Sequence, residues 1–108
     1  MIHLHIENVT TYHKHAQVSR EWYEEAASRH PEVARRVRTT IGWDYETFDD
    51  EMKTADVLMF MGLGAFSTEN FAARAPKLGW IQMTSAGVEH IMPFDWLPRS
   101  VVVTNNGG

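Results

Sequence analysis

The fold of this chain is decided by the stretch WIQMTSAGVEH, residues 80–90. Its first part, residues 80–84, has the composition of a short strand, and Val88 opens a predicted helix. Between strand and helix stand three small residues, Ser85, Ala86 and Gly87. Small residues allow a tight turn, and the first amides of a following helix point outward without partners. Such a corner can hold a carboxylate or a phosphate, and a turn chosen only for close packing accounts for the same residues.

Four other segments have the pattern of strands. They are residues 2–6, 37–42, 57–61 and 101–104. In the first, apolar residues alternate with His3 and His5, which predicts a strand with one apolar face. Segment 57–61 is apolar throughout, as is typical of a central parallel strand buried on both faces. Segment 37–42 is more polar, and we therefore expect it at an edge of the sheet.

Helices are predicted in the connections between these strands. Their expected ranges are 15–28, 31–36, 44–54, 68–75 and 88–92. In the first helix, Val18, Trp22 and Ala26 follow helical spacing and are expected on the buried side. Thr68 is a suitable cap for the fourth helix.

Strands separated by helices imply an α/β fold, here a flavodoxin-like, five-stranded parallel sheet with helices on both faces. The strand order 2-1-3-4-5 fits best, because the second strand is polar and the third is the most apolar. The printed sequence stops directly after the fifth strand. The helix that would cover this end of the sheet is therefore expected to be missing, and residues 1–108 are assigned to one domain.

The composition excludes several classes of function. Ten Lys and Arg stand against 14 Asp and Glu, a net charge of −4, whereas nucleic acids and anionic membranes need clustered positive charge. The chain has no cysteine, which excludes disulfides, thiolate metal ligands and thiol nucleophiles. No apolar run approaches the ~18 residues of a membrane span. We expect no nucleic-acid or membrane partner, and the cytoplasm is the default location.

Ligands of such sheets bind beyond the carboxyl ends of the strands, near the point where the strand order reverses. The loops expected there are residues 8–9, 61–64 and 85–87. Residues 62–67, GLGAFS, resemble a G-x-G-x-x-G/A nucleotide-binding turn. The acidic residue that this fingerprint needs ~20 positions later is missing, so a glycine loop shaped by its backbone is the better interpretation.

The six histidines suggest a metal site, but their spacing does not support one. We expect His3 and His5 to be solvated or at a sheet edge, and His90 to lie on a helix surface. No arrangement of Ser, His and an acid suggests a nucleophile. The four tryptophans are interpreted as anchors of the core and the sheet edge, at Trp22, Trp43, Trp80 and Trp96.

Several segments together resemble one family, the D-isomer-specific 2-hydroxyacid dehydrogenases. They are residues 55–58 (ADVL), 78–89 (LGWIQMTSAGVE), 97–98 (LP) and 101–106 (VVVTNN). The similarity is to the N-terminal, substrate-binding domain of that family, and it is most specific over residues 80–106. Glu89 departs from the family pattern, in which an Asp is commoner, but it keeps the charge.

The resemblance implies a substrate-binding domain joined by a hinge to an NAD(P)-binding Rossmann domain beyond Gly108. Such an enzyme interconverts 2-hydroxy acids and 2-keto acids with NAD or NADP, like a glyoxylate or hydroxypyruvate reductase. Backbone amides would hold the substrate carboxylate, in the loop of Ser85, Ala86, Gly87 and Val88. A second loop would lie beside the same cleft, formed by Met61, Gly62 and Leu63. The hinge would begin at Asn105 and Asn106.

The family's catalytic Arg, acid and His, and its glycine fingerprint, would also lie beyond Gly108. We therefore expect no catalytic, cofactor-binding or metal-binding residue in this chain, and no activity of the chain alone. A homodimer is expected for the full-length protein, and self-association for the truncated chain. The alternative is a stand-alone flavodoxin-like binding or interaction module without redox activity.

Overall fold

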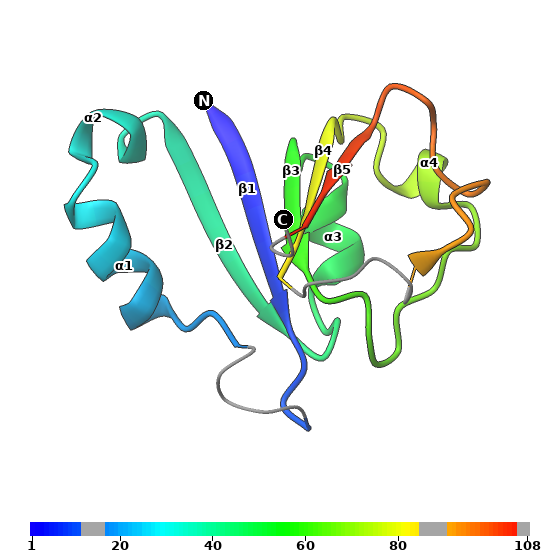
Figure 1. The fold of residues 1–108 in the computed structure, drawn as a ribbon, viewed down its shortest axis with the longest axis horizontal. Coiled ribbons are helices and arrows are strands. Elements are labelled where there is room, and N and C mark those ends of the chain that lie inside the picture. Colours follow the sequence, from blue (N-terminus) through cyan, green and yellow to red (C-terminus); the bar gives the residue numbers. More distant parts are fainter. Residues whose placement is uncertain (12–16, 85–90, 106–108) are drawn as a thin grey trace.

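The computed structural model of this chain describes residues 1–11, 17–84 and 91–105. Its five strands form one all-parallel sheet in the order β2-β1-β3-β4-β5, which confirms the predicted α/β, flavodoxin-like fold (Figure 1). The strands are β1 (Ile2–Asn8), β2 (Val37–Trp43), β3 (Val57–Phe60), β4 (Trp80–Met83) and β5 (Val102–Thr104). The polar second strand lies at an edge, as its composition predicted.

The described residues form four helices in the connections, α1 (Arg20–Ser28), α2 (Pro31–Ala34), α3 (Phe48–Met52) and α4 (Phe71–Arg74). Helices α3 and α4 pack on one face of the sheet, where Phe48, Met52 and Phe71 are buried. Helix α1 lies on the opposite face beside β2, where the Thr39 hydroxyl donates to the Tyr23 hydroxyl at 2.6 Å. No helix among the described residues is long and apolar enough to cross a membrane.

The hydrophobic core lies between α3, α4 and the sheet. Alternate residues of β3 and β4 point into it, because strand side chains alternate between faces. These residues are Leu58, Phe60, Ile81 and Met83, all at most 1% exposed. Burying each large side chain contributes about 1.5–3 kcal/mol.

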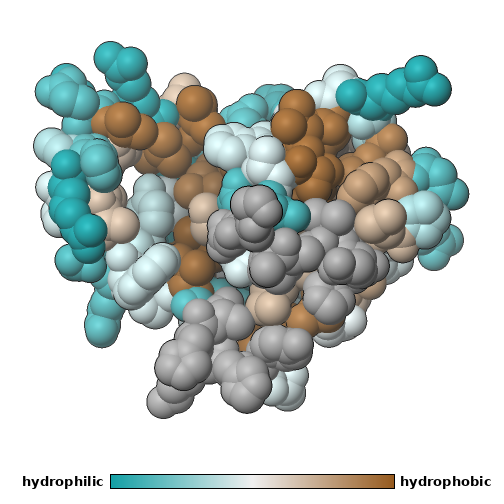
Figure 2. Space-filling view, in the orientation of Figure 1, coloured by the Kyte–Doolittle hydropathy of each residue, from teal (hydrophilic) through white to brown (hydrophobic). Residues whose placement is uncertain are grey.

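The other face of β3, β4 and β5 is open. Trp80 and Val102 are 43% and 57% exposed, and Ile2 on β1 is 48% exposed. Figure 2 shows apolar residues at the surface in the upper half of the view, on both sides of a pale residue near the centre. The prediction that β3 is buried on both faces is therefore wrong for this side, where Val57 and Met59 are half-buried. The described helices leave this part of the sheet uncovered.

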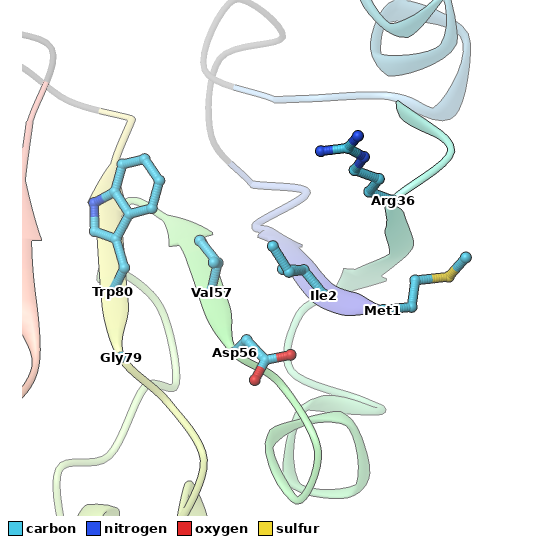
Figure 3. A pocket seen from close by; sticks show the side chains of 7 residues that line it. All are labelled: Met1, Ile2, Arg36, Asp56, Val57, Gly79 and Trp80. Carbon is cyan, nitrogen blue, oxygen red and sulfur yellow. The ribbon is translucent and has the colours of Figure 1, made fainter. Parts of the chain in front are cut away.

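An open hollow of about 770 Å³ lies on this side, at the amino ends of the strands (Figure 3). Its lining consists of Met1, Ile2, Arg36, Asp56, Val57, Gly79 and Trp80. Since ligands of parallel sheets bind at the carboxyl ends of the strands, this hollow is at the wrong end to be the predicted site.

Helix α2 begins at Pro31 as predicted, whereas α1, α3 and α4 begin later than the sequence predicted. Helix α1 starts at Arg20, because the Ser19 hydroxyl caps it by accepting from Trp22 N at 3.1 Å. Trp22 is 63% exposed, so its predicted burial is wrong. Helix α4 starts at Phe71 with Asn70 as its cap, in place of Thr68.

Helix α3 begins at Phe48 rather than at residue 44. Asp44 and Tyr45 have φ of 55° and 64°, which no α-helix can include. The predicted helix 88–92 falls largely on residues outside the described ones.

Candidate functional site

The candidate site lies at the carboxyl edge of the sheet, where the parallel strands end. Met61, Gly62 and Leu63 follow β3 there and are half-buried. Asn105 follows β5 and is exposed. The other predicted site residues lie outside the described part of the chain, namely Ser85, Ala86, Gly87, Val88 and Asn106.

The described residues on either side of segment 85–90 both contact the end of β3. Thr84 N donates to the Phe60 carbonyl oxygen at 3.0 Å. Ile91 is buried and lies so close to Gly62 that a Cβ added there would be 2.5 Å from Ile91 Cγ2. The end of β3 thus lies beside one flank of the predicted corner, and the loop after β3 lies beside the other, as expected at the carboxyl edge of a parallel sheet.

Two glycines shape the loop after β3. Gly62 and Gly64 have φ of 78° and 77°, in the left-handed region that residues with a Cβ rarely adopt. A Cβ added at Gly64 would lie 3.2 Å from Val9 Cγ2 and 3.3 Å from Tyr45 Cε2. The loop therefore packs closely against the neighbouring loops that follow β1 and β2.

Phe66 anchors the far end of this loop in an aromatic cluster. Its ring meets those of Phe60, Trp96 and Phe71 edge to face, with centroids 4.9, 5.6 and 5.8 Å away. It also stacks on Tyr45 at 6.1 Å. Aromatic pairs of this kind contribute about 0.5–1.5 kcal/mol each beyond the area they bury. One end of the loop is thereby fixed to the core.

The loop after β2 has an unusual backbone at Asp44 and Tyr45, since neither left-handed residue is a glycine. Asp44 N donates to the Asn8 carbonyl oxygen at 2.7 Å. Its carboxylate accepts from Thr10 Oγ1 at 2.7 Å and from Thr10 N at 2.9 Å. The Thr10 hydroxyl, and then its amide, hold the pKa of the Asp44 carboxyl below its usual value. These contacts join the loops that follow β1 and β2.

Tyr45 joins this corner to the loop after β3. Its hydroxyl donates to the Leu63 carbonyl oxygen, and its ring meets Phe48 edge to face at 5.2 Å. Burial raises the pKa of Tyr45, and the charges of Glu7 and Asp44 raise it further. The hydroxyl therefore keeps its proton at neutral pH and remains a hydrogen-bond donor.

Glu7, at the end of β1, holds Tyr45 from the other side. Its Oε2 accepts from Tyr45 N at 2.5 Å, and its Oε1 accepts from His5 Nε2 at 2.8 Å. The side chain is fully buried, so these donors replace the water that the carboxylate has lost. Gly42 leaves room for it, since a Cβ there would lie 2.6 Å from Glu7 Oε1.

His3 and His5 continue this chain of hydrogen bonds along β1, and the prediction that they are solvated or at an edge is wrong. They are 3% and 0% exposed and face α3, whereas Ile2 on the other side is the exposed residue. Thr40 Oγ1 lies between the two rings, 2.8 Å from His3 Nε2 and 2.7 Å from His5 Nδ1. Alternation predicted the strand but not which of its faces is buried.

One assignment of protons satisfies these contacts. Because the Glu7 carboxylate accepts, His5 Nε2 carries a proton and His5 Nδ1 accepts from the Thr40 hydroxyl. The Thr40 oxygen then accepts from His3 Nε2.

Arg38 and Thr54 end this series of hydrogen bonds, because both donate to His3. His3 Nδ1 accepts from Arg38 Nη2 at 3.1 Å and from the Thr54 hydroxyl at 3.0 Å. Burial lowers the pKa of His3, and the Arg38 charge lowers it further. In residues 1–11, 17–84 and 91–105, every buried side-chain nitrogen and oxygen has a hydrogen-bond partner.

The structure also assembles a group that the sequence did not reveal, His3 and His5 with Glu51 from α3. Their potential metal-ligand atoms lie within 4.8 Å of one another. A metal bound by both rings would take the lone pairs that now accept hydrogen bonds, and it would lie near the Arg38 guanidinium. The hydrogen bonds therefore account for the cluster without an ion.

Residues 62–67 do not form a nucleotide-binding turn. Helix α4 has four residues and begins only at Phe71, so the glycine loop does not run directly into a helix. Arg74 fills the connection by donating to the Ser67 and Glu69 carbonyl oxygens at 2.9 and 2.8 Å. These residues do not fit the pyrophosphate of NAD or NADP.

Comparison with protein-family models, with curated proteins and with solved structures found no match to this chain. The dehydrogenase-like pattern of residues 80–106 therefore stays a prediction.

Proposed function

We propose that this chain is the substrate-binding part of an NAD(P)-dependent oxidoreductase that interconverts 2-hydroxy acids and 2-keto acids. The observation that carries the proposal is the parallel order 2-1-3-4-5, with the end of β3 beside Thr84 and the loop after β3 beside Ile91, on the two flanks of segment 85–90. The resemblance of residues 80–106 to the dehydrogenases indicates the class of reaction, and small acids such as glyoxylate and hydroxypyruvate are the proposed substrates.

In this proposal, backbone amides bind the substrate carboxylate and the loop after β3 forms a neighbouring wall. The amides belong to Ser85, Ala86, Gly87 and Val88. The wall consists of Met61, Gly62 and Leu63. The hinge to a following domain begins at Asn105 and Asn106.

NAD or NADP is assigned to that following domain, because residues 62–67 do not fit it. When bound there, the cofactor supplies hydride. The role of this chain is to orient the substrate. Binding then restricts the rotation of the substrate beforehand, and this lowers the entropic part of the activation barrier. The proton donor is assigned to the following domain as well, and the complete protein is proposed to be a cytoplasmic homodimer.

The first test compares the complete reading frame with the 108-residue chain in assays of NADH and NADPH oxidation. We expect the complete protein to reduce glyoxylate or hydroxypyruvate and the chain alone to be inactive. A G-x-G-x-x-G fingerprint should follow within ~60 residues of Gly108. Turnover by the chain alone would contradict the proposal. A reading frame without a cofactor domain would favour a stand-alone binding module.

The second test replaces Gly87 with valine in the complete protein. The added side chain should obstruct the amides and raise the substrate KM by about 10- to 100-fold. Gly79→Val is the matched control, since a Cβ at Gly79 approaches nothing closer than Asp56 O at 4.0 Å. An unchanged KM in Gly87→Val, with an active enzyme, would refute the carboxylate assignment.

A further inference from the structure

We propose that Tyr45 is a positioning residue, which holds segment 61–64 in the conformation that faces the substrate. The substrate contact of that segment rests on the proposed function. The bracing of the segment rests on the geometry alone. No local pattern in the sequence identifies Tyr45, because the residues it contacts come from β1, α3 and the loop after β3.

The segment needs a brace because two of its four residues are glycines. Glycine has the widest choice of backbone conformation, and here both glycines hold left-handed angles. Tyr45 contacts the segment at two points. Its hydroxyl donates to the Leu63 carbonyl oxygen, and its ring edge would lie 3.3 Å from a Cβ at Gly64. These contacts lie midway between the anchors at Gly62 and Phe66.

Tyr45 can act as a brace because it is itself held from three directions. Its amide donates to Glu7 Oε2 at 2.5 Å, and its ring packs on Phe48 and stacks on Phe66. Its backbone is left-handed, a conformation that persists when the surroundings fix it. The preceding residue, Asp44, is tied to Asn8 and Thr10. Tyr45 thereby transmits the fixed position of β1 to the loop after β3.

The direct test is Tyr45→Phe, which keeps the ring and removes only the hydroxyl. Tyr23→Phe is the matched control, because its hydroxyl bonds Thr39 on the opposite face of the sheet. Backbone order parameters from ¹⁵N relaxation should fall at residues 62–64 in Tyr45→Phe, from about 0.85 toward about 0.6. They should not change in Tyr23→Phe. Unchanged order parameters at 62–64 in Tyr45→Phe would overturn the bracing.

The kinetic arm uses the same two variants in the complete protein. Loss of one neutral hydrogen bond should raise the substrate KM by about 3- to 10-fold in Tyr45→Phe. The value of kcat should change by less than about 2-fold, because the reacting groups lie elsewhere. A merely structural defect would instead lower the fraction of active enzyme and the apparent kcat.

The outcomes separate this inference from the proposed function. Lower order parameters at residues 62–64 together with a raised KM in Tyr45→Phe support the positioning role of Tyr45. Looser residues with an unchanged KM in an active enzyme overturn the substrate-facing role of the segment. An inactive wild-type protein refutes the proposed function and with it that role, and the order parameters then decide whether Tyr45 braces the loop.

Discussion

A carboxylate as deeply buried as that of Glu7 is stable in a folded protein only when hydrogen-bond donors surround it. His5 and Tyr45 supply those donors, one to each oxygen. The arrangement leaves little room, since Gly42 is the residue facing Glu7 Oε1. At the scale of single residues, the position of the Glu7 carboxylate therefore depends on the absence of a side chain at Gly42.

Gly42→Ala should destabilise the protein by about 1–3 kcal/mol, because its Cβ would lie 2.6 Å from Glu7 Oε1. Gly79→Ala is the control. Its Cβ would meet nothing closer than Asp56 O at 4.0 Å, so the variant should be neutral or gain up to about 1 kcal/mol from the stiffer unfolded chain. Urea unfolding of both variants measures the difference. Equal stability of the two would show that the carboxylate can move aside.

At the scale of the elements, the strands and their order were predictable, because composition and alternation reflect burial directly. The start of α2 at Pro31 was predictable as well, but the starts of α1 and α3 were not, since the Ser19 cap and the left-handed Asp44 are local details that outweigh periodicity. Beyond Ile2, β1 is largely buried on both faces, with Ile6 1% and His5 0% exposed, and the burial of its histidine face was not predicted. Its histidines are buried through partners on β2, α3 and the connection after α3, and these partners cannot be identified before the topology is known.

The candidate site was predictable to the same extent. Parallel topology alone places Met61, Gly62 and Leu63 at the carboxyl edge. Tyr45 was missed because its partners lie 38 and 18 residues away, at Glu7 and Leu63. Contacts of that sequence separation leave no pattern in a short window of the sequence.

The polar face of β1 should make the sheet sensitive to acid. Burial and Arg38 lower the pKa of His3 in the folded protein, so the unfolded chain binds a proton more readily. Stability should therefore fall as the pH drops below the ordinary value of 6.5. We expect His3→Asn to flatten the dependence of Tm on pH between about 7 and 5, and the exposed control His30→Asn to keep it. Parallel curves for wild type and His3→Asn would contradict this.

At the scale of the whole molecule, one face of the sheet is packed and the other is partly open. Ile2, Trp80 and Val102 are exposed there on neighbouring parts of the sheet. Contiguous apolar surface of this kind promotes association. In the proposed full-length protein, the covering helix that is expected to be missing from these 108 residues would lie over this face.

The 108-residue chain should therefore self-associate, and Val102→Lys should weaken that association. A lysine on edge strand β5 adds charge to the apolar face and also discourages strand pairing. Val33→Lys is the control, since Val33 is 62% exposed but lies on α2. Sedimentation velocity over a range of concentrations measures the effect. A chain that stays monomeric throughout would contradict the prediction.

The place of β1 in the sheet also has a consequence for how the protein is made. This strand leaves the ribosome first, yet both its neighbours, β2 and β3, are synthesised later. Until residue 60 emerges, β1 is a nascent strand with at least one unpaired edge, the kind of segment that aggregates when it is apolar. Because β1 carries His3, His5 and Glu7 among its seven residues, we expect the unpaired strand to aggregate less than a wholly apolar one would. The same side chains form the buried hydrogen bonds of the finished protein.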